Sequence, residues 1–184
     1  MSNITLPFKD KEFTTIYADP PWLETGGGKI KRGADKHYDL LKTSEIIAME
    51  SEVKRVTTDN SHCYLWVTNN FLPDGLKVLN AWGYKYKTVI TWVKPTIGIG
   101  QYFRGMSEHC LFGVRGVFPY RLDERGKRMQ GRTIINAPKQ EHSKKPNEMR
   151  QMIEKVSYSK YLELFGRGKA PENWIFWGYE SIND

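Results

Sequence analysis

The chain has 184 residues, of which 39% are hydrophobic and 27% charged, and its 28 Lys and Arg exceed its 21 Asp and Glu to give a net charge of +7. This length and composition predict a single globular domain over residues 1–184, with a core that needs no disulfide or metal, and they exclude a disordered chain. No apolar run approaches the roughly 18 residues that a membrane-spanning helix needs. The N-terminal stretch also lacks the apolar core of a secretory signal.

The cysteine content and the charge indicate a compartment and a kind of partner. Cys63 and Cys110 each lie in an apolar stretch, without a CxxC motif or a Cys/His cluster. This usage indicates a reducing, cytoplasmic location and argues against a metal site. The positive charge favours a polyanionic partner, nucleic acid or an anionic membrane surface, and the alternative is a basic protein that is merely soluble.

Short apolar runs alternate with helical patterns along the chain, which is typical of an α/β fold. The first expected strand, residues 14–18, ends before Pro20 and Pro21, because prolines cannot continue a ladder. After a Gly- and Lys-rich loop, we expect a helix that starts near Thr43 and carries Val53. Residues 62–68 are expected to form a buried strand, and the next helix opens at Pro73 and closes at Gly83.

The second half of the chain continues this alternation. Strands are expected at residues 85–93 and 108–114, joined by a Gly-containing loop. A basic region from residue 115 to 145 contains a short strand at 133–137. A helix from Pro146 to about residue 156 precedes strands at 161–165 and 174–177. The chain is thus expected to form about seven strands and three helices.

The turn at residues 19–22 is the most specific of the expected strand ends, where open α/β sheets bind their ligands. Pro20 and Pro21 fix φ and remove two N–H donors, so we expect rigid turn carbonyls without local partners. With the Asp19 carboxylate and the Trp22 ring, these carbonyls suit a planar amine on an aromatic ring, such as that of adenine. Held there, the amine nitrogen would be drawn toward sp³ and its lone pair freed for attack. The alternative is a plain strand-terminating turn with Trp22 in the core.

Residues 17–22 (Tyr-Ala-Asp-Pro-Pro-Trp) resemble the catalytic motif of the MT-A-seventy family of S-adenosylmethionine-dependent adenine amino methyltransferases. This family includes the eukaryotic messenger-RNA writer and many bacterial and phage DNA adenine methylases. Further blocks match in the family's order: Leu-Trp-Val-Thr at 65–68, Leu-Asn-Ala-Trp-Gly-Tyr at 79–84, Trp-Val-Lys at 92–94, Glu-His-Cys-Leu at 108–111, Lys-Pro at 145–146 and Glu-Leu-Phe-Gly-Arg at 163–167. The resemblance covers residues 14–178.

The resemblance implies a Rossmann-like methyltransferase fold, a mixed but mostly parallel sheet with helices on both faces. It also implies a circular permutation, in which the catalytic motif precedes the cofactor motif. In the catalytic turn of Asp19, Pro20, Pro21 and Trp22, Asp19 and the Pro20 carbonyl would bind the target amine. Trp22 and Tyr38 would pack on the flipped base. The residues implied to bind S-adenosylmethionine are Asp19, Lys145, Glu163, Phe165, Gly166, Arg167 and Glu180, with Lys145 pairing with the cofactor carboxylate. Glu180 is included because Tyr179 stands where the family often has Asn.

Two basic segments could follow nucleic-acid phosphates. The first, with Lys29, Lys31 and Arg32, leaves the catalytic turn directly and is the better placed. The second contains Arg125, Lys127 and Arg128. For each segment the alternative is a solvated basic loop.

We therefore expect an S-adenosylmethionine-dependent methyltransferase that acts on adenine in nucleic acid. DNA is favoured over RNA because no RRM or zinc-knuckle motif accompanies the domain. A non-catalytic nucleic-acid-binding partner of the same fold is one alternative, and the intact turn and Lys145 argue against it. A methyltransferase of a small adenine-containing molecule is another, and the charge of +7 disfavours it. The sequence leaves room for a homodimer or a heterodimer.

Overall fold

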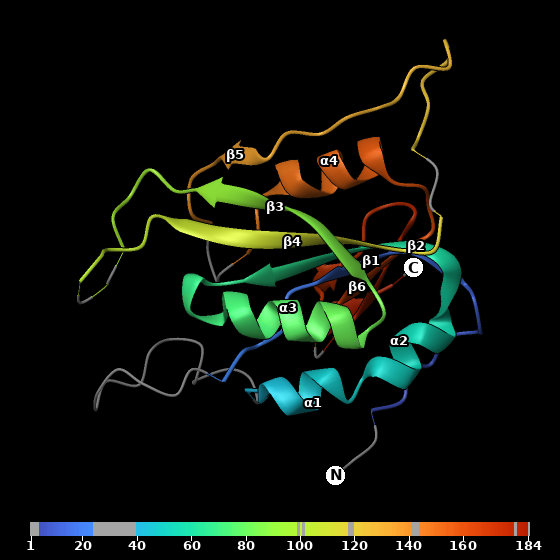
Figure 1. The fold of residues 1–184 in the computed structure, drawn as a ribbon, viewed down its shortest axis with the longest axis horizontal. Coiled ribbons are helices and arrows are strands. Elements are labelled where there is room, and N and C mark those ends of the chain that lie inside the picture. Colours follow the sequence, from blue (N-terminus) through green and yellow to red (C-terminus); the bar gives the residue numbers. More distant parts are fainter. Residues whose placement is uncertain are drawn as a thin grey trace.

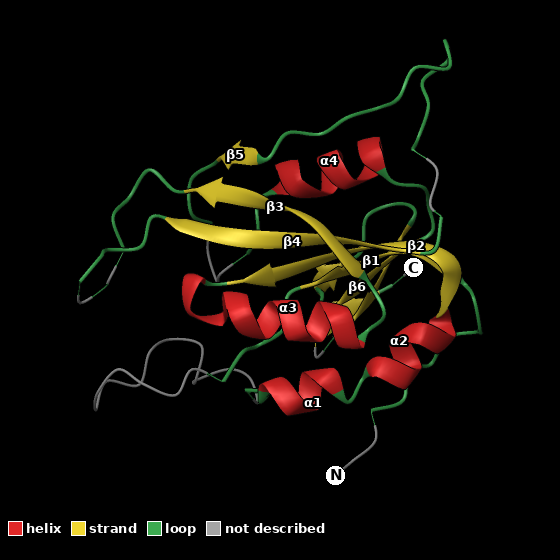
Figure 2. Ribbon diagram, viewed as in Figure 1, coloured by secondary structure: helices red, strands yellow, loops and turns green. Residues whose placement is uncertain are grey.

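A seven-stranded sheet forms the centre of the computed structural model, which describes residues 4–23, 40–98, 100, 102–117, 120–140, 144–178 and 180–183 (Figures 1 and 2). Its strands lie in the order β5 (Ile134–Asn136), β3 (Lys85–Val93), β4 (Ser107–Arg115), β2 (Thr57–Val67), β1 (Phe13–Ala18), β6 (Tyr161–Leu164) and β8 (Trp174–Trp177). Within this sheet β4 is antiparallel to both of its neighbours, and the other pairs are parallel. The expected mixed, mostly parallel sheet is confirmed.

Helices cover both faces of the sheet, as expected for a Rossmann-like methyltransferase fold (Figure 1). One face carries α1 (Thr43–Ile47), α2 (Glu50–Val56) and α3 (Leu72–Ala81), and the other carries α4 (Asn147–Val156). Because side chains alternate along a strand, β1 contributes to two cores: Ile16 and Ala18 to one, Tyr17 to the other. Of the described helices, none is long and apolar enough to cross a membrane.

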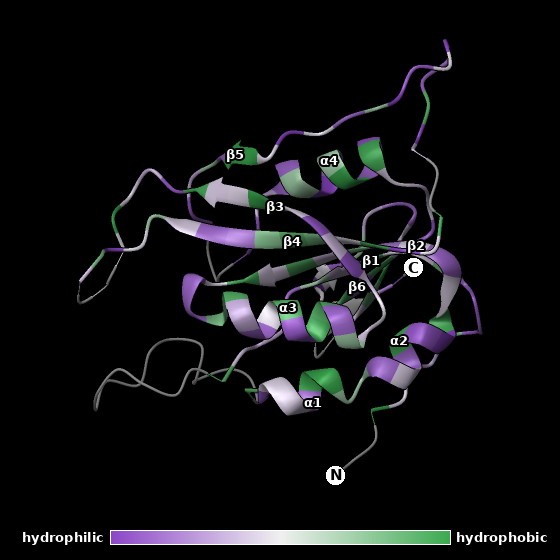
Figure 3. Cartoon of the chain, in the orientation of Figure 1, coloured by the Kyte–Doolittle hydropathy of each residue, from purple (hydrophilic) through white to green (hydrophobic). Residues whose placement is uncertain are grey.

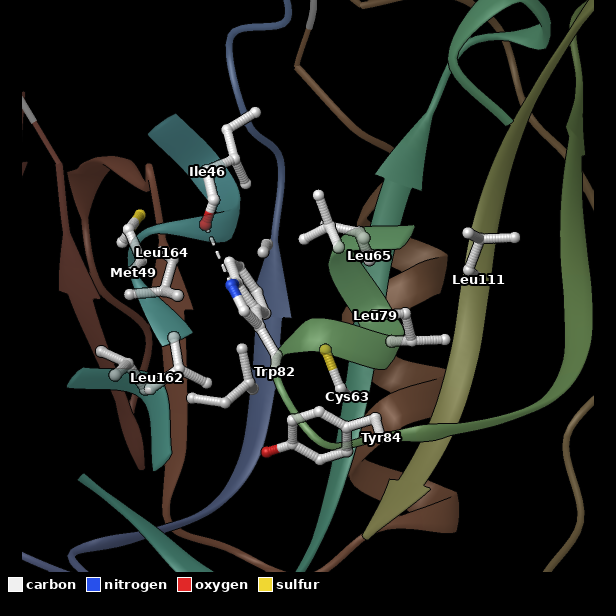
Figure 4. Close-up of a cluster of buried hydrophobic side chains, with 14 of the residues drawn as sticks. Ile46, Met49, Cys63, Leu65, Leu79, Trp82, Tyr84, Leu111, Leu162 and Leu164 are labelled. Atoms are coloured by element: carbon white, nitrogen blue, oxygen red, sulfur yellow. Dashed lines mark hydrogen bonds between the residues drawn. The ribbon is translucent and has the colours of Figure 1, made fainter. Parts of the chain in front are cut away.

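Trp82 locks α3 against α1 in the larger core (Figure 4). It is fully buried beside Leu65 and Leu79, and its indole N–H donates a 3.0 Å hydrogen bond to the Ile46 carbonyl. The Met49 N–H donates to the same carbonyl at 3.2 Å. Both lone pairs of the Ile46 oxygen are thus used, which accounts for α1 ending there and a separate α2 beginning at Glu50. The prediction of a single helix over this segment is therefore wrong.

Each of the seven expected strands has a counterpart in the central sheet, although β2 begins five residues earlier than expected. Two short strands were not expected: β7 (Arg167–Lys169) and β9 (Glu180–Ile182), which pair in a separate parallel sheet. Each has three residues and is largely polar, so neither shows the alternation that predicts a strand. The connection from β4 to β5 is mostly hydrophilic (Figure 3) and, among its described residues, has only the short bridge between Leu122 and Arg128.

The strand order explains why one edge of the sheet could bind ligands. From β1 the chain passes to β2 on one side and returns later to β6 on the other, so the topological switch point lies at the end of β1. Open α/β sheets bind ligands in the crevice outside such a point. In register, Ala18 pairs with Leu164, so the two segments that follow, at Asp19 and Phe165, leave the sheet side by side. The permuted order of the motifs thus brings the segment at Asp19 and the segment at Phe165 to the same edge of the sheet.

Candidate active site at the carboxyl edge of the sheet

The turn after β1 is held by backbone hydrogen bonds. The Pro20 carbonyl accepts from the Trp22 N–H at 2.9 Å, and the Pro21 carbonyl accepts from the Leu41 N–H at 2.8 Å, where the returning chain forms a parallel bridge with Trp22. The expectation that these carbonyls lack local partners is therefore wrong, because the Trp22 N–H folds back onto Pro20 within the turn and residue 41 comes back beside Pro21. A carbonyl oxygen has two lone pairs, so Pro20 could still accept one further hydrogen bond.

Trp22 is anchored to the end of the neighbouring strand β2. Its indole N–H donates to the Trp66 carbonyl at 3.0 Å, and its ring stacks on Phe71 with centroids 5.2 Å apart and planes 23° from parallel. Phe71 therefore occupies one face of the ring. The role on a flipped base stays a prediction, and a base could contact only the opposite face.

Four charged side chains meet at this edge, and we call them the charged quartet: Asp19, Lys94, Glu108 and Lys145. The Lys145 Nζ lies 2.6 Å from Asp19 Oδ2 and 3.4 Å from Glu108 Oε2, and Lys94 forms an ion pair with Glu108. Asp19 and Lys94 follow the carboxyl ends of β1 and β3. Glu108 lies at the start of β4, which runs the other way and so begins at the same edge. Lys145 stands just before α4.

The quartet carries alternating charges that stabilise one another. The side chain of Lys145 is only 11% exposed; burial lowers its pKa, but Asp19 and Glu108 outweigh burial and the pKa is raised overall. Burial raises the pKa of Glu108, but Lys145 and Lys94 outweigh burial and the pKa is lowered overall. Both groups are therefore charged at neutral pH. The Lys145 and Lys94 ammonium groups also lie over the rings of Trp66 and Trp92, at 5.5 and 4.7 Å from the centroids.

Glu163 lies behind this edge on β6, where Arg150 of α4 binds both of its oxygens. The Arg150 Nε donates to Oε2 at 2.8 Å and Nη2 to Oε1 at 2.9 Å, a bidentate geometry. Burial raises the pKa of Glu163 more than Arg150 lowers it, because the side chain is only 8% exposed. The ion pair thus ties α4 to the sheet. The expected role at the cofactor stays a prediction, and Glu163 would have to share its oxygens with Arg150.

The segment after β6 is tightly packed against β8. Phe165 has a φ of 64°, and its ring meets that of Trp177 edge to face at 5.7 Å. The Gly166 N–H donates to the Trp177 carbonyl at 3.1 Å, and a Cβ at Gly166 would lie 2.8 Å from the Phe176 ring. Position 166 therefore requires a glycine because the Phe176 ring packs directly against it. Arg167 and Glu180, both expected to bind the cofactor, are register partners in β7 and β9 and start these adjacent strands.

Only three of the seven residues expected to contact nucleic acid lie in the part of the chain that the structure describes. Lys29, Lys31, Arg32 and Tyr38 lie outside the described residues. Arg125, Lys127 and Arg128 belong to a turn organised by Asp123, whose Oδ1 accepts the backbone N–H groups of Arg125 and Lys127 at 2.9 and 2.8 Å.

This basic turn is far from Asp19 along the strand direction. Arg121, at its start, donates to the Glu154 carbonyl near the end of α4, whereas α4 begins beside Lys145. The turn therefore projects at the opposite edge of the sheet (Figure 1). The structure does not bring Arg125, Lys127 and Arg128 together with the catalytic turn, and their contact with phosphates stays a prediction.

Sequence reasoning missed the roles of Lys94, Glu108 and Arg150 at this site. The 13 residues between Lys94 and Glu108 include three glycines and show no helical pattern, which favours a hairpin and an antiparallel strand over a crossover helix. That signal would have placed Glu108 at the carboxyl edge. Nothing in the local pattern pairs Arg150 with Glu163, because the contact is made across the packing of a helix on a sheet. Among the described residues, no group of three or more His, Cys, Asp and Glu gathers as metal ligands would.

The fold and the edge described above define a Rossmann-like α/β protein with a carboxylate and a buried ammonium at its switch point. A profile of the MT-A70 family matches residues 13–180, so the chain belongs to the MT-A70 family.

Three relatives extend this finding. The chain is 32% identical to the human N(6)-adenosine-methyltransferase catalytic subunit METTL3, over 91% of this chain and 28% of METTL3. It is 31% identical to a rice protein named as a probable MT-A70-like N(6)-adenosine-methyltransferase, over 91% of this chain and 23% of the rice protein. It is 28% identical to the type II methyltransferase M.MunI of Mycoplasma sp., over 92% of this chain and 78% of that protein. The chain thus spans about a quarter of the human and rice relatives.

Proposed function

We propose that this chain transfers a methyl group from S-adenosylmethionine to the exocyclic amine of adenine in DNA. The observation that carries the proposal is the Asp19–Lys145 pair, 2.6 Å apart, directly after β1 at the topological switch point of the sheet. Membership of the MT-A70 family and the names of the relatives, two of them adenosine methyltransferases, support the same chemistry.

The donor set at this edge suits the amino-acid end of S-adenosylmethionine. That end carries one carboxylate and one ammonium, and the site offers one buried ammonium, Lys145, beside one partly exposed carboxylate, Asp19. Lys145 has three N–H groups, and its two carboxylate partners leave one for a third acceptor. When bound, S-adenosylmethionine supplies an electrophilic methyl group on its sulfonium.

Asp19 and the Pro20 carbonyl are the groups that would orient the target amine. Both are acceptors, and an amine whose two N–H groups donate to them keeps its lone pair directed away from the protein. Hydrogen bonds of this kind strengthen as positive charge develops on the nitrogen, so they stabilise the transition state more than the ground state. The target adenine must be flipped from a duplex or presented in a single strand to reach this edge.

DNA is proposed as the substrate because the chain covers 78% of a type II methyltransferase, M.MunI. RNA is the second candidate. It is favoured by the adenosine-methyltransferase names of the human and rice relatives, at 32% and 31% identity. The net charge of +7 suits either polyanion and disfavours a small neutral acceptor.

Incorporation of labelled methyl from S-adenosylmethionine into matched DNA, RNA and free adenosine tests the proposal. We expect the label in DNA oligonucleotides at the highest kcat/KM. Removal of an oriented transition-state hydrogen bond costs about 10²–10³ in rate, so Asp19→Ala should lose nearly all transfer. Asp59→Ala is the matched control, because this aspartate is 85% exposed and is paired with Lys11 away from the site.

Two results would contradict the proposal. If RNA or free adenosine is methylated in preference to DNA, the substrate assignment is wrong. If folded Asp19→Ala protein, checked by circular dichroism, keeps more than about a tenth of the wild-type rate, the role of Asp19 is wrong, because even the smaller loss expected here is about 10².

A further inference from the structure

The connection between β3 and β4 is a braced hairpin that projects from the sheet (Figure 1). At its base the Lys94 N–H donates to the Met106 carbonyl at 2.7 Å, and further out the Gly98 N–H donates to the Gly105 carbonyl at 2.8 Å. The Arg104 side chain donates to the Gly98 carbonyl at 2.9 Å and clamps the two arms together. The tip is therefore held out on a paired stem.

Two aromatic rings stand at this tip almost entirely in solvent. Tyr102 is 92% exposed and Phe103 is 91% exposed, the two highest values among the large hydrophobic side chains that the structure describes. Rings held out of a core forgo the favourable free energy of burial. Apolar surface that is kept exposed in this way marks an interaction site.

The hairpin shares its edge with the catalytic turn. Its two arms end at Lys94 and Glu108, which belong to the charged quartet with Asp19 and Lys145. Tyr102 follows Lys94 by eight positions, so their Cα atoms can lie at most about 28 Å apart. Stacked bases are about 3.4 Å apart, so this upper limit corresponds to about eight nucleotides from a target bound at Asp19.

The chemistry of the tip fits nucleic-acid bases. Aromatic side chains provide flat faces on which bases stack whatever their sequence, and the neighbouring Arg104 adds a positive charge. A target base taken out of its stack leaves neighbours without a partner, and aromatic or apolar side chains fill such gaps. The net charge of +7 favours a polyanion over a second copy of this equally basic chain.

We propose that Tyr102 and Phe103 stack on bases that flank the target adenine, so that the β3–β4 hairpin positions the nucleic acid at the catalytic edge. This inference rests on the proposed function. It adds a contact surface that is separate from the charged quartet, and it assigns the hairpin to substrate binding rather than to cofactor binding.

The test compares the Tyr102→Ala/Phe103→Ala double variant with wild type in two assays. The first measures kcat and KM for methylation of an oligonucleotide with one adenine. The second measures the fluorescence of 2-aminopurine placed in turn at positions that flank the target, since a ring stacked on this base quenches it. Val117→Ala is the matched control: Val117 is 87% exposed just beyond the opposite end of β4.

Removal of a stacking ring weakens nucleic-acid binding by roughly 5- to 150-fold per base. We expect the double variant to raise KM at least about five-fold, to lose quenching at one or two flanking positions, and to bind S-adenosylmethionine as wild type does. Tyr102→Trp/Phe103→Trp should restore the wild-type KM. Val117→Ala should leave both assays unchanged.

Three outcomes separate this inference from its alternatives. An unchanged KM with unchanged quenching overturns the role of the hairpin and leaves the proposed function standing. A lower molecular mass of the double variant in light scattering, with loss of activity, shows that the rings hold a protein partner and also overturns it. Wild-type protein that methylates no nucleic acid and quenches no 2-aminopurine overturns the proposed function itself.

Discussion

Lys145 is the residue on which the charges of the site converge. Its ammonium contacts two carboxylates, those of Asp19 and Glu108, and its side chain is nearly buried. An isolated buried charge is strongly unfavourable, so the nearly buried Lys145 depends on these two carboxylates for its ionised state. The neighbouring Lys144 is exposed and takes no part in the quartet, so the sequence pair Lys144-Lys145 contains one site residue and one surface residue.

Lys145→Ala is therefore expected to weaken S-adenosylmethionine binding, while Lys144→Ala leaves it unchanged. A charge-assisted hydrogen bond is worth about 1.5–3 kcal/mol, so the cofactor Kd should rise roughly 10- to 150-fold on loss of the Lys145 ammonium. Titration calorimetry with S-adenosylmethionine measures this. Unchanged affinity in Lys145→Ala, or an equal loss in Lys144→Ala, would refute the assignment.

Among the elements, α3 packs closely against the sheet through one glycine. A Cβ built on Gly75 would lie 2.4 Å from Val67 Cγ1 and 2.9 Å from Leu111 Cδ1. Val67 is β-branched and fully enclosed, so its methyl group cannot turn aside without disturbing β2. The helix thus packs through this glycine onto the strand that ends beside Trp22.

Gly75→Ala is expected to destabilise the fold. Alanine favours a helix over glycine by about 1 kcal/mol, but a contact as close as 2.4 Å places the cost of overpacking in the upper part of its usual range of about 1–3 kcal/mol, so the net loss should be about 1–2 kcal/mol. Urea unfolding measures the difference. Asn80→Ala, at an exposed position of the same helix, is the control and should be neutral or slightly stabilising. A Gly75→Ala protein as stable as wild type would show that α3 can move away.

His62 joins β2 to the segment after α4. Its Nδ1 lies 2.7 Å from the Ser157 hydroxyl, which is also 2.8 Å from the Tyr64 hydroxyl, and burial lowers the pKa of His62 to about 4. An unfolded histidine has a pKa of about 6.5, so between about pH 6.5 and pH 4 the unfolded chain binds more protons at this position. Stability must therefore fall as the pH is lowered through this range.

The histidine should contribute a loss of about 3 kcal/mol between pH 7 and pH 4, because each pH unit between the folded and unfolded pKa values is worth about 1.4 kcal/mol. His62→Gln keeps a polar group beside Ser157 but cannot take up the proton. Its free energy of unfolding should depend less on pH than that of wild type across this interval. Parallel pH dependence of the two proteins, measured by urea unfolding from pH 7 to pH 4, would contradict the prediction.

The elements also show where sequence reasoning succeeds. Strands that end at proline or glycine, such as β1 before Pro20 and β6 before Gly166, could be located because the breaking residue is local. The split between α1 and α2 could not, because it depends on a hydrogen bond from Trp82, far along the chain. At the site, the positions of Asp19 and Lys145 could be predicted because each lies in a local motif. The position of Glu108 depends on the direction of β4, and that of Arg150 depends on how α4 packs on the sheet, so neither could be predicted locally.

At the scale of the whole molecule, the strand order gathers the functional elements at one edge. The catalytic turn after β1, the hairpin between β3 and β4 and the start of α4 all meet there, although they are about 125 residues apart along the chain. The basic turn with Arg125 and Arg128 projects at the opposite edge (Figure 1). A substrate that contacts both must therefore extend along the sheet.

Nucleoside mass spectrometry of a DNA oligonucleotide treated with the protein and S-adenosylmethionine tests the central claim most directly. The account predicts methylation on the exocyclic amine of adenine by wild type, and none above background by folded Asp19→Ala protein. Methyl groups on cytosine, on a ring nitrogen of adenine or on no base at all would contradict it, as would the same methylated adenine formed at an undiminished yield by Asp19→Ala.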